Sequence, residues 1–69
     1  MKRYANILAI VDRDTGMLSV WYRFEGSQIV GRHEHDQDAG DWSDDGIRNC
    51  VAGLIDAEEQ TDSIKIAWV

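Results

Sequence analysis

The sequence predicts a small α+β domain, an antiparallel meander of three strands packed on one helix, with a final strand, in the order β-β-β-α-β. Three short segments with strand-like apolar patterns come first, separated by turns that contain glycine. One segment with apolar residues at helical spacing follows, and a short alternating run comes last. Because the chain has only 69 residues, we expect one compact domain over residues 1–69, with a core near the lower size limit.

The first two strands are expected at residues 4–11 and 17–25. Residues 4–11 (YANILAIV) form a nearly continuous apolar run, which predicts a central strand covered on both faces. Residues 12–16 hold two aspartates and a glycine, as hairpin loops often do. Residues 17–25 alternate, so one set of side chains faces the core: Leu18, Val20, Tyr22 and Phe24. Trp21 then lies on the opposite face, exposed if the helix covers the first set.

A third strand is expected at residues 28–35, and the helix begins after Ser43. Ser43 is a favourable N-cap, and Asp44 and Asp45 follow in the first turn, where the helix dipole favours negative charge. The apolar stripe of the helix is Ile47, Cys50, Val51, Leu54 and Ile55. We expect the helix to run to about residue 60, with Cys50 buried as a small apolar side chain. Trp42 is spaced to pack on the first turn as a hydrophobic staple.

The last strand is expected at residues 64–69, with Trp68 packed in the core beside Ile64 and Ile66. Since the helix crosses over the sheet, this strand should pair parallel to the first one. One helix covers only one face of a sheet. The other face, which carries Trp21, is therefore left to solvent, to a partner, or to a second copy in a homodimer.

The charge of the chain restricts its partners. Thirteen Asp and Glu against seven Lys and Arg give a formal net charge of -6, which disfavours direct binding of nucleic acid or an anionic membrane. Residues 34–45 hold six carboxylates and no Lys or Arg: Glu34, Asp36, Asp38, Asp41, Asp44 and Asp45. We expect these carboxylates, with Trp21 and Trp42 as apolar anchors, to bind a basic protein. An alternative explanation of the acidic bias is the base composition of the source genome, or a salty cytoplasm.

No complete catalytic or metal-binding motif is present, so we expect no enzyme activity and no cofactor. His33 and His35 would point to the same side of a strand and are the candidates for a metal site, but no C-x-x-C spacing supports one. A single cysteine excludes an internal disulfide and favours a reducing cytoplasm. The apolar run at residues 7–11 is too short for a signal peptide or a membrane span.

The order β-β-β-α-β resembles the first half of the RNase H fold. Asp12 is similar in position to the first acid of that family, but Asp44 and Asp45 stand at the helix start. The third acid, after the fourth strand, has no counterpart, so we expect no nuclease activity. A truncated version of this fold resembles the HicB-type antitoxins, which implies neutralisation of a small RNase. Their proline-containing loop has no match in residues 33–42.

The size, the acidic charge and the lack of catalytic equipment are also similar to small phage inhibitors of the anti-CRISPR type. This resemblance implies a non-enzymatic inhibitor that blocks nucleic-acid binding by a basic protein or a CRISPR effector subunit. It would act in the cytoplasm, that of the host cell if the protein is phage-encoded. The antitoxin and a metal-binding module built on His33 and His35 are the alternatives.

Overall fold

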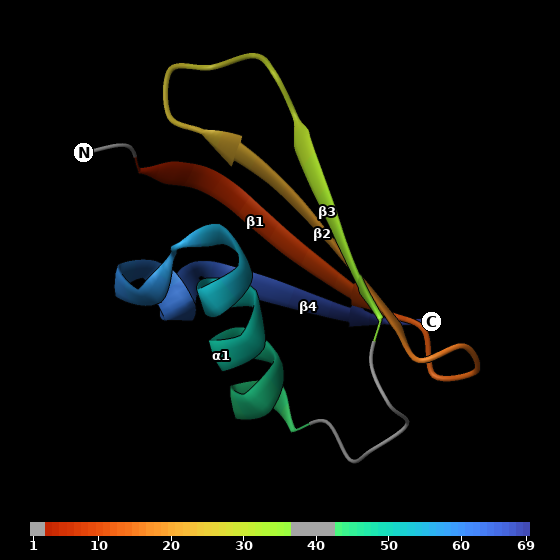
Figure 1. The fold of residues 1–69 in the computed structure, drawn as a ribbon. Helices are drawn as coiled ribbons and strands as arrows, with labels where there is room; N and C mark the ends of the chain where they lie inside the picture. The colour runs from red at the N-terminus through yellow and green to blue at the C-terminus, as the bar shows by residue number, and fades with distance from the viewer. Residues whose placement is uncertain (1–2, 37–42) are drawn as a thin grey trace.

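The computed structural model describes residues 3–36 and 43–69. It contains the elements in the predicted order, β-β-β-α-β, with a 3-10 helix inserted before the last strand (Figure 1). Their bounds are β1 (Tyr4–Val11), β2 (Met17–Phe24), β3 (Gly31–Asp36), α1 (Asp44–Ile55), the 3-10 helix (Glu58–Ser63) and β4 (Ile64–Trp68).

The four strands form one mixed sheet in the order β3-β2-β1-β4. β1 pairs antiparallel with β2, and β2 pairs antiparallel with β3, which is the predicted meander. β4 lies beside β1 and runs parallel to it, as expected from the crossover. α1 and the 3-10 helix lie together on one side of the sheet, so the molecule has two layers (Figure 1).

The core lies between these two layers. Its buried apolar side chains come from three strands and the helical segment, and they are Ile7, Ala9, Val11, Leu18, Val20, Ile47, Val51, Ala52, Ile55, Ala57 and Ile64. The prediction that the Leu18 face of β2 points to the core is confirmed by full burial of Leu18 and Val20. Tyr22, from the same face, is half-buried against the core.

The prediction that β1 is covered on both faces is wrong. Alternate residues of β1 are buried, but Leu8 between them keeps 37% of its surface exposed. Both helical elements lie on the same face of the sheet, so nothing among the described residues forms a layer over the other face (Figure 1). The nearly continuous apolar run of β1 therefore places apolar side chains on both faces of a sheet that is covered on one.

α1 begins as predicted and ends earlier. The Ser43 hydroxyl accepts a hydrogen bond from the backbone N–H of Gly46 at 3.0 Å, which confirms the N-cap. The helix stops at Ile55 rather than near residue 60, because Asp56 adopts a left-handed conformation with φ 55°. The chain then tightens into the 3-10 helix, which turns the Gln60 side chain inward. Trp42 lies outside the described residues, so the staple does too.

Three smaller predictions also need correction. β3 starts at Gly31 rather than at residue 28. Trp68 is 36% exposed, and the Arg13 guanidinium lies 4.9 Å from the centre of its ring, so it is not a core residue like Ile64. α1 covers the earlier part of β4 and leaves its end at the rim of the sheet (Figure 1). Cys50 is half-buried rather than fully buried.

Candidate functional site

Among the described residues, the structure places Glu34 apart from Asp44 and Asp45, which the sequence groups with it into one acidic surface. Asp44 and Asp45 are exposed at the start of α1. Glu34 is exposed on β3, where it pairs with Ser19 of β2. Because Ser19 alternates with the buried residues of β2, Glu34 lies on the sheet face opposite the helix. Asp36 belongs to β3, whereas Asp38 and Asp41 lie outside the described residues, as does Trp42.

The helical segment of residues 43–63, called the helix layer below, carries most of the exposed negative charge that the structure describes. Its six carboxylates are all exposed: Asp44, Asp45, Asp56, Glu58, Glu59 and Asp62. Arg48, half-buried, is the only Lys or Arg of this segment. Within the described ranges, none of these six carboxylates forms an ion pair. They are therefore open to an external cation.

Four of these carboxylates were missed as candidates by the sequence reasoning. Residues 56–62 hold four acids and no Lys or Arg, which is as dense as the run that was selected at residues 34–45. Residues 56–60 were assigned to the expected helix, and their charge was not considered. α1 has 12 residues and is about 18 Å long at 1.5 Å per residue. The two acidic groups lie at opposite ends of the layer, at the first turn of α1 and at the 3-10 helix (Figure 1).

The uncovered sheet face has a different character. One row of residues crosses all four strands in register: Arg32, Trp21, Leu8 and Lys65. The Arg32 guanidinium lies 4.8 Å from the centre of the Trp21 ring and also forms an ion pair with Glu34. Trp21 is 37% exposed here, so its predicted position on the face opposite the core is confirmed. Its role as a partner anchor stays a prediction.

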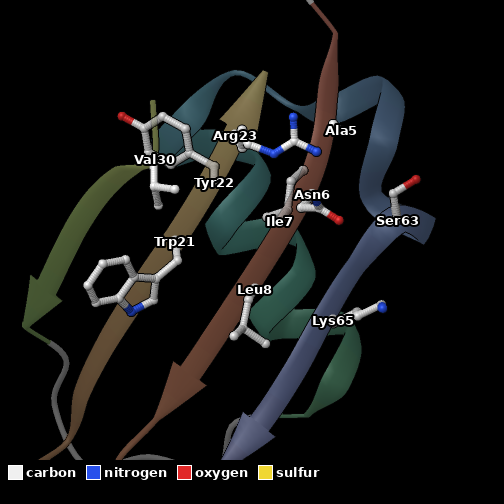
Figure 2. Close-up of a pocket in the computed structure, with 10 residues that line it drawn as sticks. All are labelled: Ala5, Asn6, Ile7, Leu8, Trp21, Tyr22, Arg23, Val30, Ser63 and Lys65. Carbon is white, nitrogen blue, oxygen red and sulfur yellow. The ribbon is translucent and has the colours of Figure 1, made fainter. Parts of the chain in front are cut away.

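A groove with a volume of about 490 Å³ runs over this face. Figure 2 shows it from the side opposite α1, with Trp21 and Leu8 on neighbouring strands and Lys65 on the strand beyond. The lining residues are Ala5, Asn6, Ile7, Leu8, Trp21, Tyr22, Arg23, Val30, Ser63 and Lys65. None of them is acidic, although the chain has almost twice as many acidic as basic residues.

The two histidines lie on the other side of β3. His33 pairs with Val20 and His35 with Leu18, so both are on the helix side of the sheet, at its β3 edge. His33 is exposed and His35 is half-buried. In the part of the chain that the structure describes, no three His, Cys, Asp or Glu side chains come together as metal ligands.

Two further groups of chemical interest have structural roles. The Asp12 carboxylate accepts hydrogen bonds from the backbone N–H groups of Asp14 at 2.9 Å and Thr15 at 3.3 Å. It therefore closes the β1–β2 turn, as aspartates in such turns do. Burial raises the pKa of the Cys50 thiol above its ordinary value. A raised pKa keeps the thiol protonated at neutral pH, which is the opposite of an activated nucleophile.

Comparison with known proteins adds no relative to this description. No protein family, no curated protein and no solved structure matches the chain. Among the described helices, none is both long enough and apolar enough to cross a membrane.

Proposed function

We propose that this protein is a non-enzymatic inhibitor that binds a basic, nucleic-acid-binding protein through its helix layer. In the anti-CRISPR-like form of this proposal, the target is a subunit of a CRISPR effector complex, and the inhibitor occupies the surface that would hold nucleic acid. One observation supports it above others. The helix layer presents six exposed carboxylates against one half-buried arginine, with no ion pair to any of the six among the described residues.

The mechanism follows from the chemistry of these groups. Carboxylates accept charge-assisted hydrogen bonds from the same Arg and Lys side chains that bind phosphate. The acidic groups at the two ends of α1 are separated by more than the Debye length of about 8 Å at physiological salt. Each end therefore acts as its own contact point, and the pair spans a basic groove rather than a single cation. Attraction between the surfaces speeds association and weakens as salt rises.

The test is a pull-down from the native host lysate at low and high salt, followed by mass spectrometry. Two variants remove the acidic groups one end at a time, Asp44→Lys with Asp45→Lys, and Glu58→Lys with Glu59→Lys. The control variant, Asp14→Lys with Glu25→Lys, has the same change in net charge at two positions outside the helix layer. Circular dichroism confirms that each variant is folded. We expect both layer variants to lose the target and the control to retain it.

The identity of the captured protein separates the alternatives. A basic nucleic-acid-binding protein, released by high salt and displaced by its own nucleic acid, supports the inhibitor. Equal loss in the control variant would mean that net charge alone governs binding and would overturn the assignment to the helix layer. Recovery of only the protein itself would remove the inhibitor proposal and favour an assembly role.

A HicB-like antitoxin remains the second candidate because the structure has the β-β-β-α-β order on which that resemblance rests. Its target would be a small RNase, and adding this protein would abolish the activity of that RNase at a one-to-one ratio. Capture of an effector subunit without any RNase would exclude this candidate.

A further inference from the structure

The groove on the uncovered sheet face has a charge opposite to that of the chain as a whole. Thirteen of the twenty charged residues are acidic, yet the charged residues in the groove are Arg23 and Lys65. The two acids that follow the groove along β2 and β3, Glu25 and Glu34, are already paired with Arg3 and Arg32. An anion in the groove therefore meets two cations and no competing carboxylate in its lining.

The rest of the lining is suited to an apolar body. Trp21 and Leu8 are register neighbours, each 37% exposed, and Val30 is 57% exposed. Pockets with apolar walls and a few polar groups, in a volume of several hundred Å³, are typical of small-molecule sites. Figure 2 shows these side chains on the same face as Arg23 and Asn6, which form the register pair two positions from Leu8 and Trp21.

The polar and aromatic groups of the groove are held in place before any ligand arrives. Arg23 donates from Nη1 to the Ser27 carbonyl at 3.0 Å. With the Asn6 amide oriented to satisfy its own neighbours, Arg23 also donates from Nη2 to Asn6 at 3.0 Å. A guanidinium has five N–H donors, so others remain for a ligand. The Trp21 ring is fixed on its other side by Arg32.

These observations favour a small ligand over a macromolecule. A polyanion such as nucleic acid would be repelled by the net charge of -6, whereas a single negative charge meets mainly the local cations. Two copies of the chain packed face to face would place two Arg23 and two Lys65 side chains in one interface, with no acidic residue in either groove lining to offset them. A copy bound through its acidic helix layer would make a head-to-tail contact, which produces a ring or a filament rather than a two-fold dimer.

We propose that this groove binds a small organic monoanion with a flat apolar body, an aromatic carboxylate. The carboxylate accepts hydrogen bonds from Arg23 and Lys65, and the ring lies against Trp21 and Leu8. The site lies on the opposite face from the helix layer, so it does not depend on the proposed inhibitor function.

The test uses 2-naphthoate as the probe, with two-dimensional NMR of the full chain and the fluorescence of its tryptophans as readouts. We expect saturable shifts of the backbone amides of Leu8, Trp21 and Lys65. The neutral analogue 2-naphthalenemethanol should bind about tenfold more weakly, because it lacks the charge-assisted hydrogen bonds. Arg23→Gln and Lys65→Gln should each weaken naphthoate binding to a similar extent. Arg13→Gln, which removes a cation stacked on Trp68 away from the groove, should leave binding unchanged.

Lys65 is exposed and has no ion pair among the described residues, so Lys65→Gln tests the site even if Arg23→Gln impairs folding. Equal affinity for naphthoate and its neutral analogue would overturn the proposal and leave only an apolar patch. Equal weakening by Arg13→Gln would overturn it as well, because it would show an effect of net charge. Shifts of the same amides on raising protein concentration without ligand would show instead that a second copy covers this face.

Discussion

Gly31 shows how one residue sets local packing. A β-carbon placed on Gly31 would lie 2.3 Å from ring atoms of Tyr22, its register neighbour on β2. We expect Gly31→Ala to lower the free energy of unfolding by about 1–3 kcal/mol, because the ring must move from its half-buried position. Gly53 is the matched control. It lies in α1 with open space around it, so Gly53→Ala should raise stability by about 0.5–1 kcal/mol. Urea unfolding measures both, and an unchanged midpoint for Gly31→Ala would contradict this packing.

Tyr4 makes the stability of the fold depend on pH in the alkaline range. Its hydroxyl donates to the Ile55 carbonyl, and burial, followed by the charges of Tyr22 and Asp56, raises its pKa above the ordinary 10.0. Since the folded-state pKa is the higher one, the unfolded chain ionises first. The contribution of the protonated Tyr4 hydroxyl to the free energy of unfolding is therefore complete below pH 10 and is lost as pH rises beyond it. We expect unfolding free energy to fall above pH 10 and Tyr4→Phe to flatten that fall. Cys50 has a raised pKa of the same sign, so the measurement is made in a Cys50→Ala background.

The Gln60 side chain could not have been assigned from sequence. Its Oε1 accepts from the Tyr4 N–H and its Nε2 donates to the Tyr4 carbonyl, both at 2.9 Å. The two residues are 56 positions apart, and no local pattern connects them. We expect Gln60→Leu to cost about 1–3 kcal/mol in urea unfolding, because it leaves both Tyr4 groups without their partner. Gln60→Glu, which keeps one acceptor, should have a stability between those of the native chain and Gln60→Leu. A Gln60→Leu variant as stable as the native chain would show that water replaces the amide.

At the scale of elements, the helix start was predictable because its signal is local. Ser43 and the aspartates after it specify the first turn, and the hydroxyl makes the expected bond. We expect Ser43→Ala to destabilise the protein by about 1 kcal/mol in thermal unfolding. Ser43→Asp keeps an acceptor at the same place and should retain most of that stability. If alanine and aspartate proved equivalent, the cap would contribute nothing.

The helix end was not predictable in the same way. The apolar stripe stops at Ile55, but residues 57–60 favour helix. The pattern therefore gives no reason to end the helix before residue 60. The actual stop depends on Asp56 in a left-handed conformation, which few non-glycine residues adopt. β1 shows the converse problem. Its apolar run suggested two covered faces, and only the position of both helical elements on one side decides which face stays open.

At the scale of the whole molecule, most of the exposed carboxylates that the structure describes lie on the helix layer, which lowers stability at low salt. Exposed like charges repel, and the Debye length falls from about 30 Å at 0.01 M to about 3 Å at 1 M salt. We therefore expect the Tm to rise by about 4 °C or more between 0.01 and 1 M NaCl, equivalent to about 1 kcal/mol. The variant Glu58→Gln, Glu59→Gln, Asp62→Asn should start from a higher Tm and rise less. An equal rise of the Tm in the native chain and the variant would show that the repulsion does not come from these three carboxylates.

The candidate surfaces were only partly foreseen for the same reason of scale. The acidic run from Glu34 to Asp45 can be read from the sequence, but Glu34 and Asp44 lie on opposite sides of the sheet. The groove unites Trp21, Leu8 and Lys65 from three strands, and only the register brings them into one row. Residues that line one groove here are close across the sheet, and their spacing in the sequence does not reveal that distance.

The parallel pairing of β4 with β1 has a consequence for synthesis of the chain. Ile64 is a core residue, and the β4 edge of β1 has no partner until residues 64–68 have been made. At 5–20 residues per second, the ribosome takes about 3–11 s to extend the chain from Val11 to Ile64. During this time the hairpin of β1 and β2 exposes the side chains that later form the core. The nascent chain therefore passes through an aggregation-prone stage that ends in one late closing step. Lys65, the β4 side of the groove, is added in that same step.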